Sequence, residues 1–173
     1  MKNNVILKLA LALSAVIMCM PAQAQLQQTC NANTIETAPE SRFTINNNQT
    51  VTDQATGLIW KRCSQGQSGD SCAGLASGFT WPQALQAAQA EVFANQSDWR
   101  LPNIKELTSI VEYACRSPAI NLTVFPNTPQ NFWSASPDTF NTDEAWSVSL
   151  NNGLVFSVIR DDGQSVRLVR GGQ

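Results

Sequence analysis

Four cysteines stand in the chain after residue 24, and they constrain its fold more than any other feature. They are Cys30, Cys63, Cys72 and Cys115. Cys63 and Cys72 bracket a flexible polar segment that can close on itself, which leaves Cys30 to pair with Cys115. Four cysteines allow three pairings, and the other two stay open at this point. We expect two disulfides that staple the folded chain.

The first residues are typical of a signal peptide. Two lysines precede and overlap an apolar run from Val5 to Met20, and residues 22–24 read Ala-Gln-Ala, the small-x-small pattern of a cleavage site. Cys19 lacks the preceding small residue of a lipid-attachment box. The apolar run is too short to anchor the chain in a membrane. We therefore predict a signal peptide over 1–24 and an exported protein, periplasmic or extracellular at the cell surface, with no integral membrane segment after cleavage. Disulfides persist in these compartments.

Removal of residues 1–24 takes away two lysines and no acid. The remaining 149 residues carry 9 Lys and Arg against 13 Asp and Glu, a net charge of −4. A nucleic-acid partner is not expected, because binding to phosphates needs a basic face. This length suits one domain with a substantial core. We predict an N-terminal arm over 25–42, tied down by its cysteine, and a single domain over 43–173.

The stretch from Trp99 to Leu107 predicts the start of a helix. Pro102 disfavours helical geometry at the residue before it, and Asn103 is placed to cap the helix with Glu106 completing a capping box. Apolar residues then recur at helical spacing up to about Arg116: Ile104, Leu107, Val111 and Ala114. We expect structural roles for Trp99, Arg100, Asn103 and Glu106, with Arg100 and Glu106 forming an ion pair.

A second helix is predicted earlier in the chain, from a Thr80 cap with Gln83 at the capping-box position to about Asn95. Its expected buried stripe is Trp81, Leu85, Ala88 and Val92. Alternating and turn-bounded segments predict strands at 43–51, 58–62, 132–136, 146–150, 154–160 and 166–170. The sequence therefore predicts an α+β fold, with two helices packed on irregular antiparallel strands and a C-terminal β-meander.

Several short motifs occur in one order along the chain. They are Thr56-Gly57-Leu58-Ile59-Trp60, the Cys63 to Cys72 loop, Trp99-Arg100-Leu101-Pro102 with Glu106-Leu107, Phe132-Trp133-Ser134-Ala135-Ser136, Ala145-Trp146, Gly153 and Val166-Arg167-Leu168-Val169-Arg170. Over about residues 50 to 170 this order resembles the Lcl C-terminal domain family, named after a bacterial collagen-like adhesin. The Arg100 helix start and the closing Val-Arg-x-Val-Arg strand are also similar to the formylglycine-generating enzyme fold, a relative of C-type lectin domains.

The resemblance implies a C-type-lectin-like α+β domain and a secreted or surface role in adhesion or glycan binding. The chain departs from the adhesin in having no collagen-like Gly-x-y region. The net negative charge of the chain after residue 24 also argues against binding of sulfated glycans, which the resemblance to the adhesin would otherwise imply.

The chain contains no histidine, which excludes Ser-His-Asp and Cys-His mechanisms. No cysteine follows Cys115, so an oxidase of the formylglycine-generating type lacks its reactive thiol pair. Acids in predicted loops, which are Asp138, Asp143, Glu144, Asp161 and Asp162, are interpreted as solvated turn residues rather than calcium ligands or hydrolase carboxylates. We predict no enzyme activity, no metal and no cofactor.

Candidate ligand-binding residues are Trp133 and, on the last strands, Arg160, Arg167 and Arg170. All five tryptophans lie in apolar patterns that favour the core, and Trp133 is the best candidate among them for an exposed, sugar-stacking indole. The arginines either bind a carboxylate or sulfate or pair with Asp161, Asp162 or buried backbone groups. With loops 117–131 and 137–144, these four candidates lead us to expect a non-enzymatic module that binds a polysaccharide or an envelope or surface protein. A structural subunit of a surface or pilus assembly is the first alternative, and a hydrolase using Asp143 or Glu144 is the second. The sequence leaves the oligomeric state open.

Overall fold

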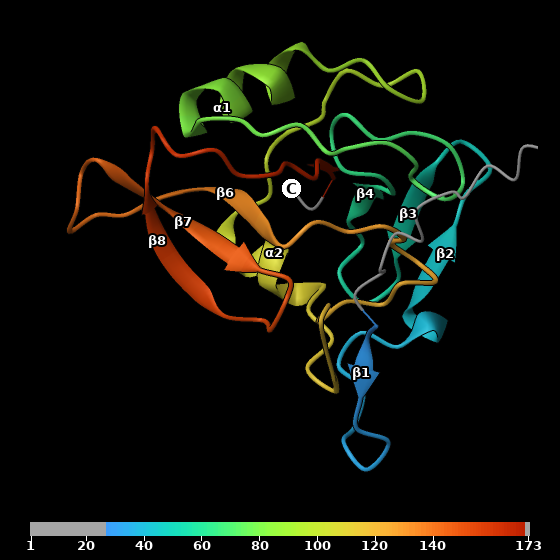
Figure 1. The fold of residues 1–173 in the computed structure, drawn as a ribbon. Coiled ribbons are helices and arrows are strands. Elements are labelled where there is room, and N and C mark those ends of the chain that lie inside the picture. The colour runs from blue at the N-terminus through green and yellow to red at the C-terminus, as the bar shows by residue number, and fades with distance from the viewer. Residues whose placement is uncertain (1–26, 172–173) are drawn as a thin grey trace, which may run out of the picture.

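A computed structural model describes residues 27–171 of the chain. The predicted signal peptide lies outside these residues. Three antiparallel sheets and two short helices make up the fold (Figure 1), which is an α+β arrangement stapled by two disulfides, Cys30–Cys115 and Cys63–Cys72. Both expected cysteine pairs are therefore present.

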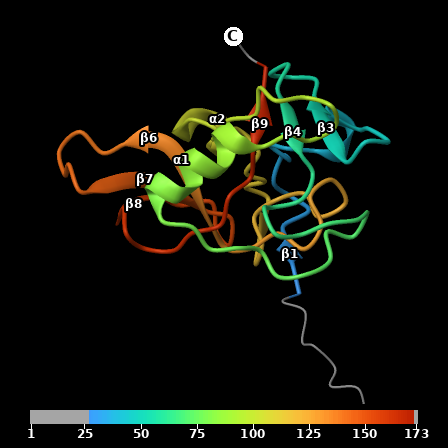
Figure 2. The ribbon, with the colours of Figure 1, turned by 90° about the horizontal axis from the view of Figure 1, so that it is seen from above.

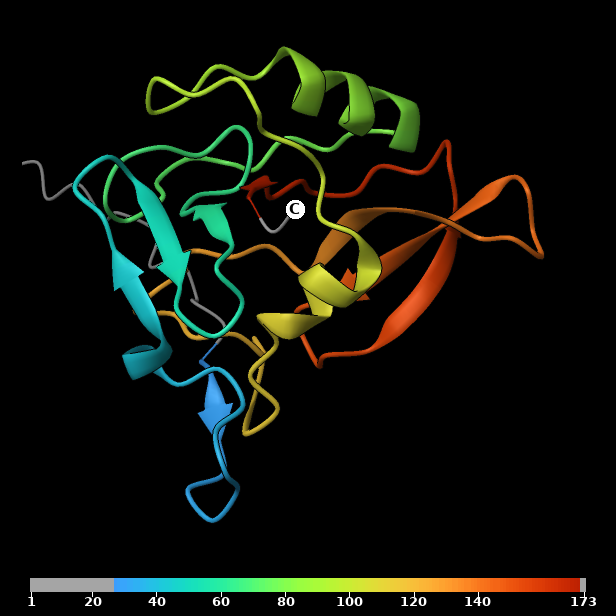
Figure 3. The same cartoon turned by 180° about the vertical axis from the view of Figure 1, so that it is seen from behind.

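The larger sheets lie side by side. One has the order β2-β3-β4-β9, formed by β2 (Phe43–Ile45), β3 (Thr50–Asp53), β4 (Ile59–Lys61) and β9 (Val169–Arg170). The other is the meander of β6 (Asn131–Pro137), β7 (Glu144–Ser149) and β8 (Val155–Ile159). A third sheet pairs β1 (Thr29–Cys30) with β5 (Cys115–Arg116), and a 3-10 turn, η1, spans Glu40–Arg42. Figure 3 shows the same two larger sheets from behind, with α2 (Ile104–Ser109) in front of the meander.

The first helix, α1 (Trp81–Ala90), begins as the sequence predicts but ends earlier. Thr80 and Gln83 form the complete capping box. The helix stops before Glu91, whose carboxylate accepts a 2.6 Å hydrogen bond from the Lys61 ammonium group on β4. The prediction that Val92 is buried is wrong, because its side chain is 74% exposed beyond the helix end. A contact with a distant strand thus ends the helical segment.

The second helix, α2, has the expected capping box of Asn103 and Glu106 but ends at Ser109 rather than near Arg116. The reason is the buried carboxylate of Glu112. It accepts hydrogen bonds from the backbone N–H of Thr37 and Ala38 in the N-terminal arm and from Ala114 N–H. These bonds hold residues 110–114 in turns and fasten the arm to the domain.

The last predicted strand does not extend the meander. Val169 pairs with Trp60 of β4, and its backbone also exchanges hydrogen bonds with Arg100. Val166 and Leu168, in the segment that leads to β9, are fully buried. The C-terminal segment therefore closes the first sheet and lies beside the Trp99 stretch.

Two clusters of buried side chains form the core. One joins β2–β4, α2 and residues 119–125, including Trp60, Leu107 and Phe125. The other includes Ala84 and Ala88 of α1 together with Trp99 and Trp133. Figure 2 shows the fold from above, with α1 on the side toward the viewer. Among residues 27–171, no helix has the length and apolar character needed to span a membrane.

The buried carboxylate of Asp53, at the end of β3, leads us to expect that the stability of the fold falls at low pH. Its carboxylate is fully buried and receives two hydrogen bonds from the Arg42 guanidinium, at 2.7 and 2.5 Å. Burial alone would raise the pKa of Asp53, but the hydrogen bonds from Arg42, Thr56 and the Ala55 N–H outweigh it and lower the pKa. Because the folded-state pKa is depressed, the stabilisation is full above the unfolded-state value and is lost as the pH falls through the folded-state value.

We expect Asp53→Asn to lower the free energy of unfolding by about 2 kcal/mol at pH 7, because it removes hydrogen bonds to a charged group. The difference from the wild type should shrink below pH 4. Urea unfolding at several pH values measures this, with the exposed Asp161→Asn as the control. A pH-independent difference would contradict the role of the Asp53 charge.

Candidate functional site

The structure buries Trp133, so the prediction that it is an exposed sugar-stacking residue is wrong. Its side chain on β6 is fully buried in the cluster beneath α1. The indole N–H donates a 2.7 Å hydrogen bond to the carbonyl oxygen of Phe79. Trp133 therefore connects the meander to the segment that precedes α1.

Arg167 is also buried, and it does not face a ligand. Its guanidinium donates to the carbonyl oxygens of Lys61 and Arg62 and, at 2.9 Å, to the Thr128 hydroxyl. The cation lies 4.7 Å from the centre of the Phe125 ring. Burial lowers the pKa of Arg167 to about 9, so the side chain remains charged at neutral pH. This arginine joins β4 to the loop after residue 125.

The other two candidate arginines lie apart from Arg167 and from each other. Arg160 stacks over the Trp81 ring at 4.5 Å and donates to the Glu144 carbonyl. Arg170 on β9 donates a 2.7 Å hydrogen bond to Asp98. The three guanidinium groups therefore share no common face.

The Trp99 stretch lines a hollow of about 360 Å³ between α1 and α2. Arg100 and Glu106 form two 2.8 Å hydrogen bonds there, and Glu106 also accepts from the Asn103 N–H. The bonds to Glu106 raise the pKa of Arg100. Burial opposes ionisation of Glu106, but its partners lower its pKa. Trp99 is buried and donates to the Phe93 carbonyl. The positive charge of Arg100 is therefore paired with the negative charge of Glu106 within this hollow.

The predicted loop 137–144 is exposed but ordered by its own turn. Asp138 accepts a 2.8 Å hydrogen bond from the Phe140 N–H, and the Phe140 side chain is 92% exposed. Glu144 accepts from the Ser157 hydroxyl. Loop 117–131 instead carries core residues such as Ile120 and Phe125. Within the part of the chain that the structure describes, no three acidic or cysteine side chains form a group suited to a metal ion.

A wider hollow of about 480 Å³ lies beside the Cys30–Cys115 disulfide. One wall is β1 with the residues after it, and the other is β5 with the turn between β7 and β8. The disulfide joins the two walls covalently. Its lining brings together an aromatic side chain and several uncharged polar side chains with one cation: Thr29, Asn31, Thr34, Tyr113, Arg116 and Asn152. This end of the molecule carries the label β1 in Figure 1.

Tyr113, the single tyrosine of the chain, is the aromatic surface of this hollow and is 52% exposed. Gly153 lies against its ring. A Cβ atom at Gly153 would come within 2.8 Å of the ring and of Val111, and the φ of +80° suits glycine. Gly153 therefore makes room for the ring. The sequence places Tyr113 on a predicted helix, and only the early end of α2 reveals it.

The polar groups around Tyr113 are available for a ligand. Arg116 is exposed, and none of residues 27–171 forms a hydrogen bond or ion pair with its guanidinium. Asn31 and Asn152 are exposed, and their side-chain oxygens accept from nearby backbone N–H groups. Their amide nitrogens donate to no group of residues 27–171 and are available to a ligand. The Tyr113 ring is surrounded by hydrogen-bond donors on Arg116, Asn31 and Asn152. This arrangement suits a ligand with hydroxyl or carboxylate groups.

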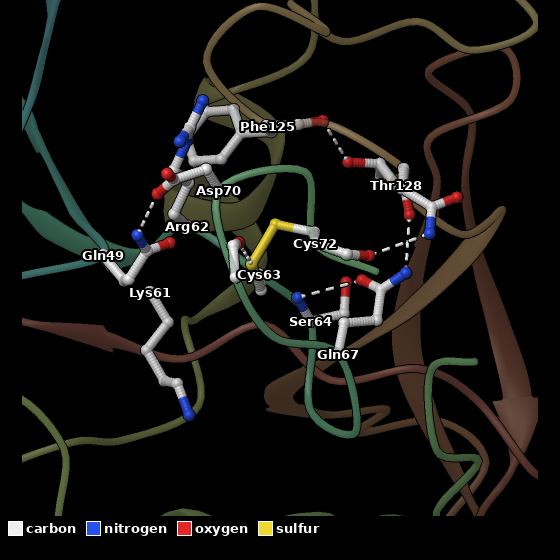
Figure 4. Close-up of a disulfide and its surroundings, with 12 residues drawn as sticks. Gln49, Lys61, Arg62, Cys63, Ser64, Gln67, Asp70, Cys72, Phe125 and Thr128 are labelled. Atoms are coloured by element: carbon white, nitrogen blue, oxygen red, sulfur yellow. Dashed lines mark hydrogen bonds between the residues drawn. A yellow bond between two sulfur atoms is a disulfide. The ribbon is translucent and has the colours of Figure 1, made fainter. Parts of the chain in front are cut away.

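The second disulfide holds a loop that is fastened at several points (Figure 4). The Asn127 amide donates a 2.8 Å hydrogen bond to the Cys72 carbonyl, and Gln67 donates to the Asn127 carbonyl at 2.8 Å. Gln49 donates to Asp70 on the other side of the loop. The polar segment between Cys63 and Cys72 is therefore part of the scaffold.

A family profile described as the Lcl C-terminal domain matches residues 49–170, which include β3 to β9 and both helices. The chain belongs to the Lcl C-terminal domain family. A search of curated proteins finds no match. In this Lcl C-terminal domain, Tyr113, Arg116 and Asn152 lie inside the matched region, whereas Asn31 and Cys30 lie in the arm before it. The hollow is thus completed by a segment outside the family domain.

Proposed function

We propose that this Lcl C-terminal domain protein is an exported, non-enzymatic recognition module that binds a polysaccharide in the Tyr113 hollow. The exposed Tyr113 ring, with free donors on Arg116, Asn31 and Asn152 around it, is the observation that carries the proposal. A pyranose packs its apolar face on an aromatic ring while its hydroxyls bond to side-chain amides. The two disulfides and the family membership support a role outside the cytoplasm.

The charge of the residues around the Tyr113 hollow indicates which kind of polysaccharide can bind there. Arg116 is the one charged side chain among its lining residues, and the mature chain is acidic. The chain as a whole would repel a densely sulfated polymer most strongly, a uronic-acid polysaccharide less because it carries fewer charges, and a neutral polysaccharide not at all. A guanidinium can bind a carboxylate through two parallel hydrogen bonds. We therefore propose a hydroxyl-rich glycan, with or without a carboxylate. We also propose a C-type-lectin-like fold for this α+β domain, because the resemblance of its motifs implies one.

A glycan array probed with the exported, oxidised protein tests the proposal. We expect Tyr113→Ala to weaken binding about 5- to 30-fold, since stacking on an aromatic side chain contributes on the order of 1–2 kcal/mol. Arg116→Ala should weaken mainly the acidic ligands. Phe140→Ala is the matched control, because it removes another exposed aromatic ring far along the chain and should leave glycan binding unchanged. Absence of array binding, or equal binding by Tyr113→Ala, would reject the site.

Binding of an envelope protein is the second candidate, and the exposed Phe140 favours it. The Asp138 turn holds this ring outward at the tip between β6 and β7. Exposed aromatic side chains are frequent anchors of protein interfaces. Co-purification of a defined envelope protein that is lost in Phe140→Ala but retained in Tyr113→Ala would support this candidate. A hydrolase, the third candidate, would show glycan turnover that Glu144→Gln abolishes.

A further inference from the structure

The meander of β6, β7 and β8 has one covered edge and one open edge. On the β6 side, Trp133 N–H donates to the Ser165 carbonyl, and Ala135 N–H donates to the Pro102 carbonyl. On the other side, β8 pairs with β7 and with no other segment of residues 27–171. Figures 1 and 3 both show β8 as the outermost strand of this sheet. The backbone of β8 is therefore available to a further strand.

The register of β7 and β8 identifies which backbone groups are open. Ser149 N–H donates to the Leu154 carbonyl, and Arg160 N–H donates to the Asp143 carbonyl. Hydrogen-bonded pairs alternate along an antiparallel ladder, so the even-numbered residues of β8 bond to β7. Val155, Ser157 and Ile159 direct their N–H and C=O groups away from β7, and among these groups the Ile159 carbonyl already accepts a 3.0 Å hydrogen bond from the Asp162 N–H. The other sheet edge, at β2, has three residues.

The open edge lacks the features with which proteins usually prevent strand pairing. Residues 153–159 contain no charged residue and no proline, and Val155 and Ile159 are 42% and 51% exposed. Natural edge strands are usually shortened, charged or covered. An uncovered apolar edge of five residues is therefore typical of a strand that has a partner.

We infer that β8 pairs with β8 of a second copy of this chain, about a two-fold axis at Ser157, to form a continuous six-stranded sheet. The strand is self-complementary about that point: Val155 of one copy faces Ile159 of the other, and the two Ser157 residues face each other. The N–H groups of all three residues and the carbonyls of Val155 and Ser157 point outward and are open to the second copy, whereas the Ile159 carbonyl would share its acceptor oxygen with the Asp162 N–H. A two-fold axis creates this kind of interface, in which the same patch is used twice.

The charges beyond the strand agree with this register. Antiparallel pairing about Ser157 places Arg160 opposite Leu154 and Asp161 opposite Gly153 of the other copy. No two like charges face each other, which would destabilise a strand pair. The occupant we assign to the edge is therefore a second copy rather than an unrelated peptide.

Sedimentation velocity of the exported, oxidised protein over a range of concentrations tests the inference. We expect a reversible dimer in the wild type. Ser157→Pro removes one interface N–H from each copy without removing a backbone hydrogen bond to β7, and proline is tolerated at such edge positions. We expect its dissociation constant to rise at least ~30-fold. Ser157→Ala is the matched control, because it loses the same hydroxyl bond to Glu144 but keeps the N–H, and should remain dimeric.

A second variant tests the same interface in case Ser157→Pro fails to fold. Val155→Lys places a charge on the edge, with Val92→Lys as the control at an exposed apolar site at the end of α1. We expect the first to be monomeric and the second dimeric, both with the wild-type near-ultraviolet circular dichroism spectrum. A wild type that stays monomeric at all concentrations overturns the inference, even if it binds an extended peptide at β8. A dimer that persists in both Ser157→Pro and Val155→Lys also overturns it.

Discussion

Replacement of Arg167 by methionine is expected to lower the free energy of unfolding by roughly 4 kcal/mol. The guanidinium is fully buried and serves acceptors from two separate segments, the carbonyls of Lys61 and Arg62 and the hydroxyl of Thr128. Methionine fills a similar volume but donates no hydrogen bond, so these acceptors stay buried and unpaired. The stacking on Phe125 would lose its charge as well.

Chemical unfolding of the purified variants measures this effect. Arg170→Met is the matched control, because Arg170 pairs with an Asp98 side chain that is 56% exposed, and an ion pair of that kind contributes less than about 1 kcal/mol. Arg167→Lys should lie between the two, since an ammonium group retains the charge but cannot reach all the acceptors. Equal effects of Arg167→Met and Arg170→Met would show that the buried network does not stabilise the fold.

Loss of the Cys30–Cys115 disulfide is expected to have an effect of similar size. The bridge spans 85 residues, and the chain-entropy relation gives about 4.6 kcal/mol for a loop of that length. The Cys63–Cys72 bridge spans 9 residues, for which the same relation gives about 2.6 kcal/mol. The long bridge also joins the walls of the Tyr113 hollow, so its loss should weaken glycan binding, whereas loss of the short bridge should not.

Comparison of two double variants tests whether the long disulfide stabilises the fold more than the short one. Cys30→Ser with Cys115→Ser should unfold at a lower denaturant concentration than Cys63→Ser with Cys72→Ser, and a reducing agent should bring the wild type below both. Glu112 holds the arm independently through Thr37 and Ala38. If Glu112 alone sufficed to hold the arm, the long-loop variant would match the wild type in stability, and the entropic argument would fail.

The features that sequence predicts correctly here are those decided by near neighbours along the chain. The capping boxes at Thr80 and Asn103 each involve residues three positions apart. The pairing of Cys63 with Cys72 follows from the short polar loop between them, and Cys30–Cys115 then follows by elimination. The order of short motifs was enough to predict membership of the Lcl C-terminal domain family.

The predictions that were wrong concern residues whose partners are distant in the sequence. The local sequence around a tryptophan or an arginine on a strand does not show whether its side chain is buried, so the sequence offers Trp133 and Arg167 as candidates for a surface although both are buried. Arg167 bonds to a carbonyl 106 residues away, and Glu112, which diverts the chain after α2, bonds to an N–H 74 residues away. The same diversion exposes Tyr113, which no periodicity could have singled out.

The sequence by itself determined the starts of both helices and the family and favoured the observed disulfide pairing over the two others, because capping, closure of the Cys63–Cys72 loop and motif order depend on chemistry within short segments. Where each helix ends, which sheet receives Val169 and which aromatic ring faces solvent were decided by tertiary structure. Those outcomes depend on burial and on hydrogen bonds between segments that only folding brings together, and the free energy of such contacts outweighs local helical preference.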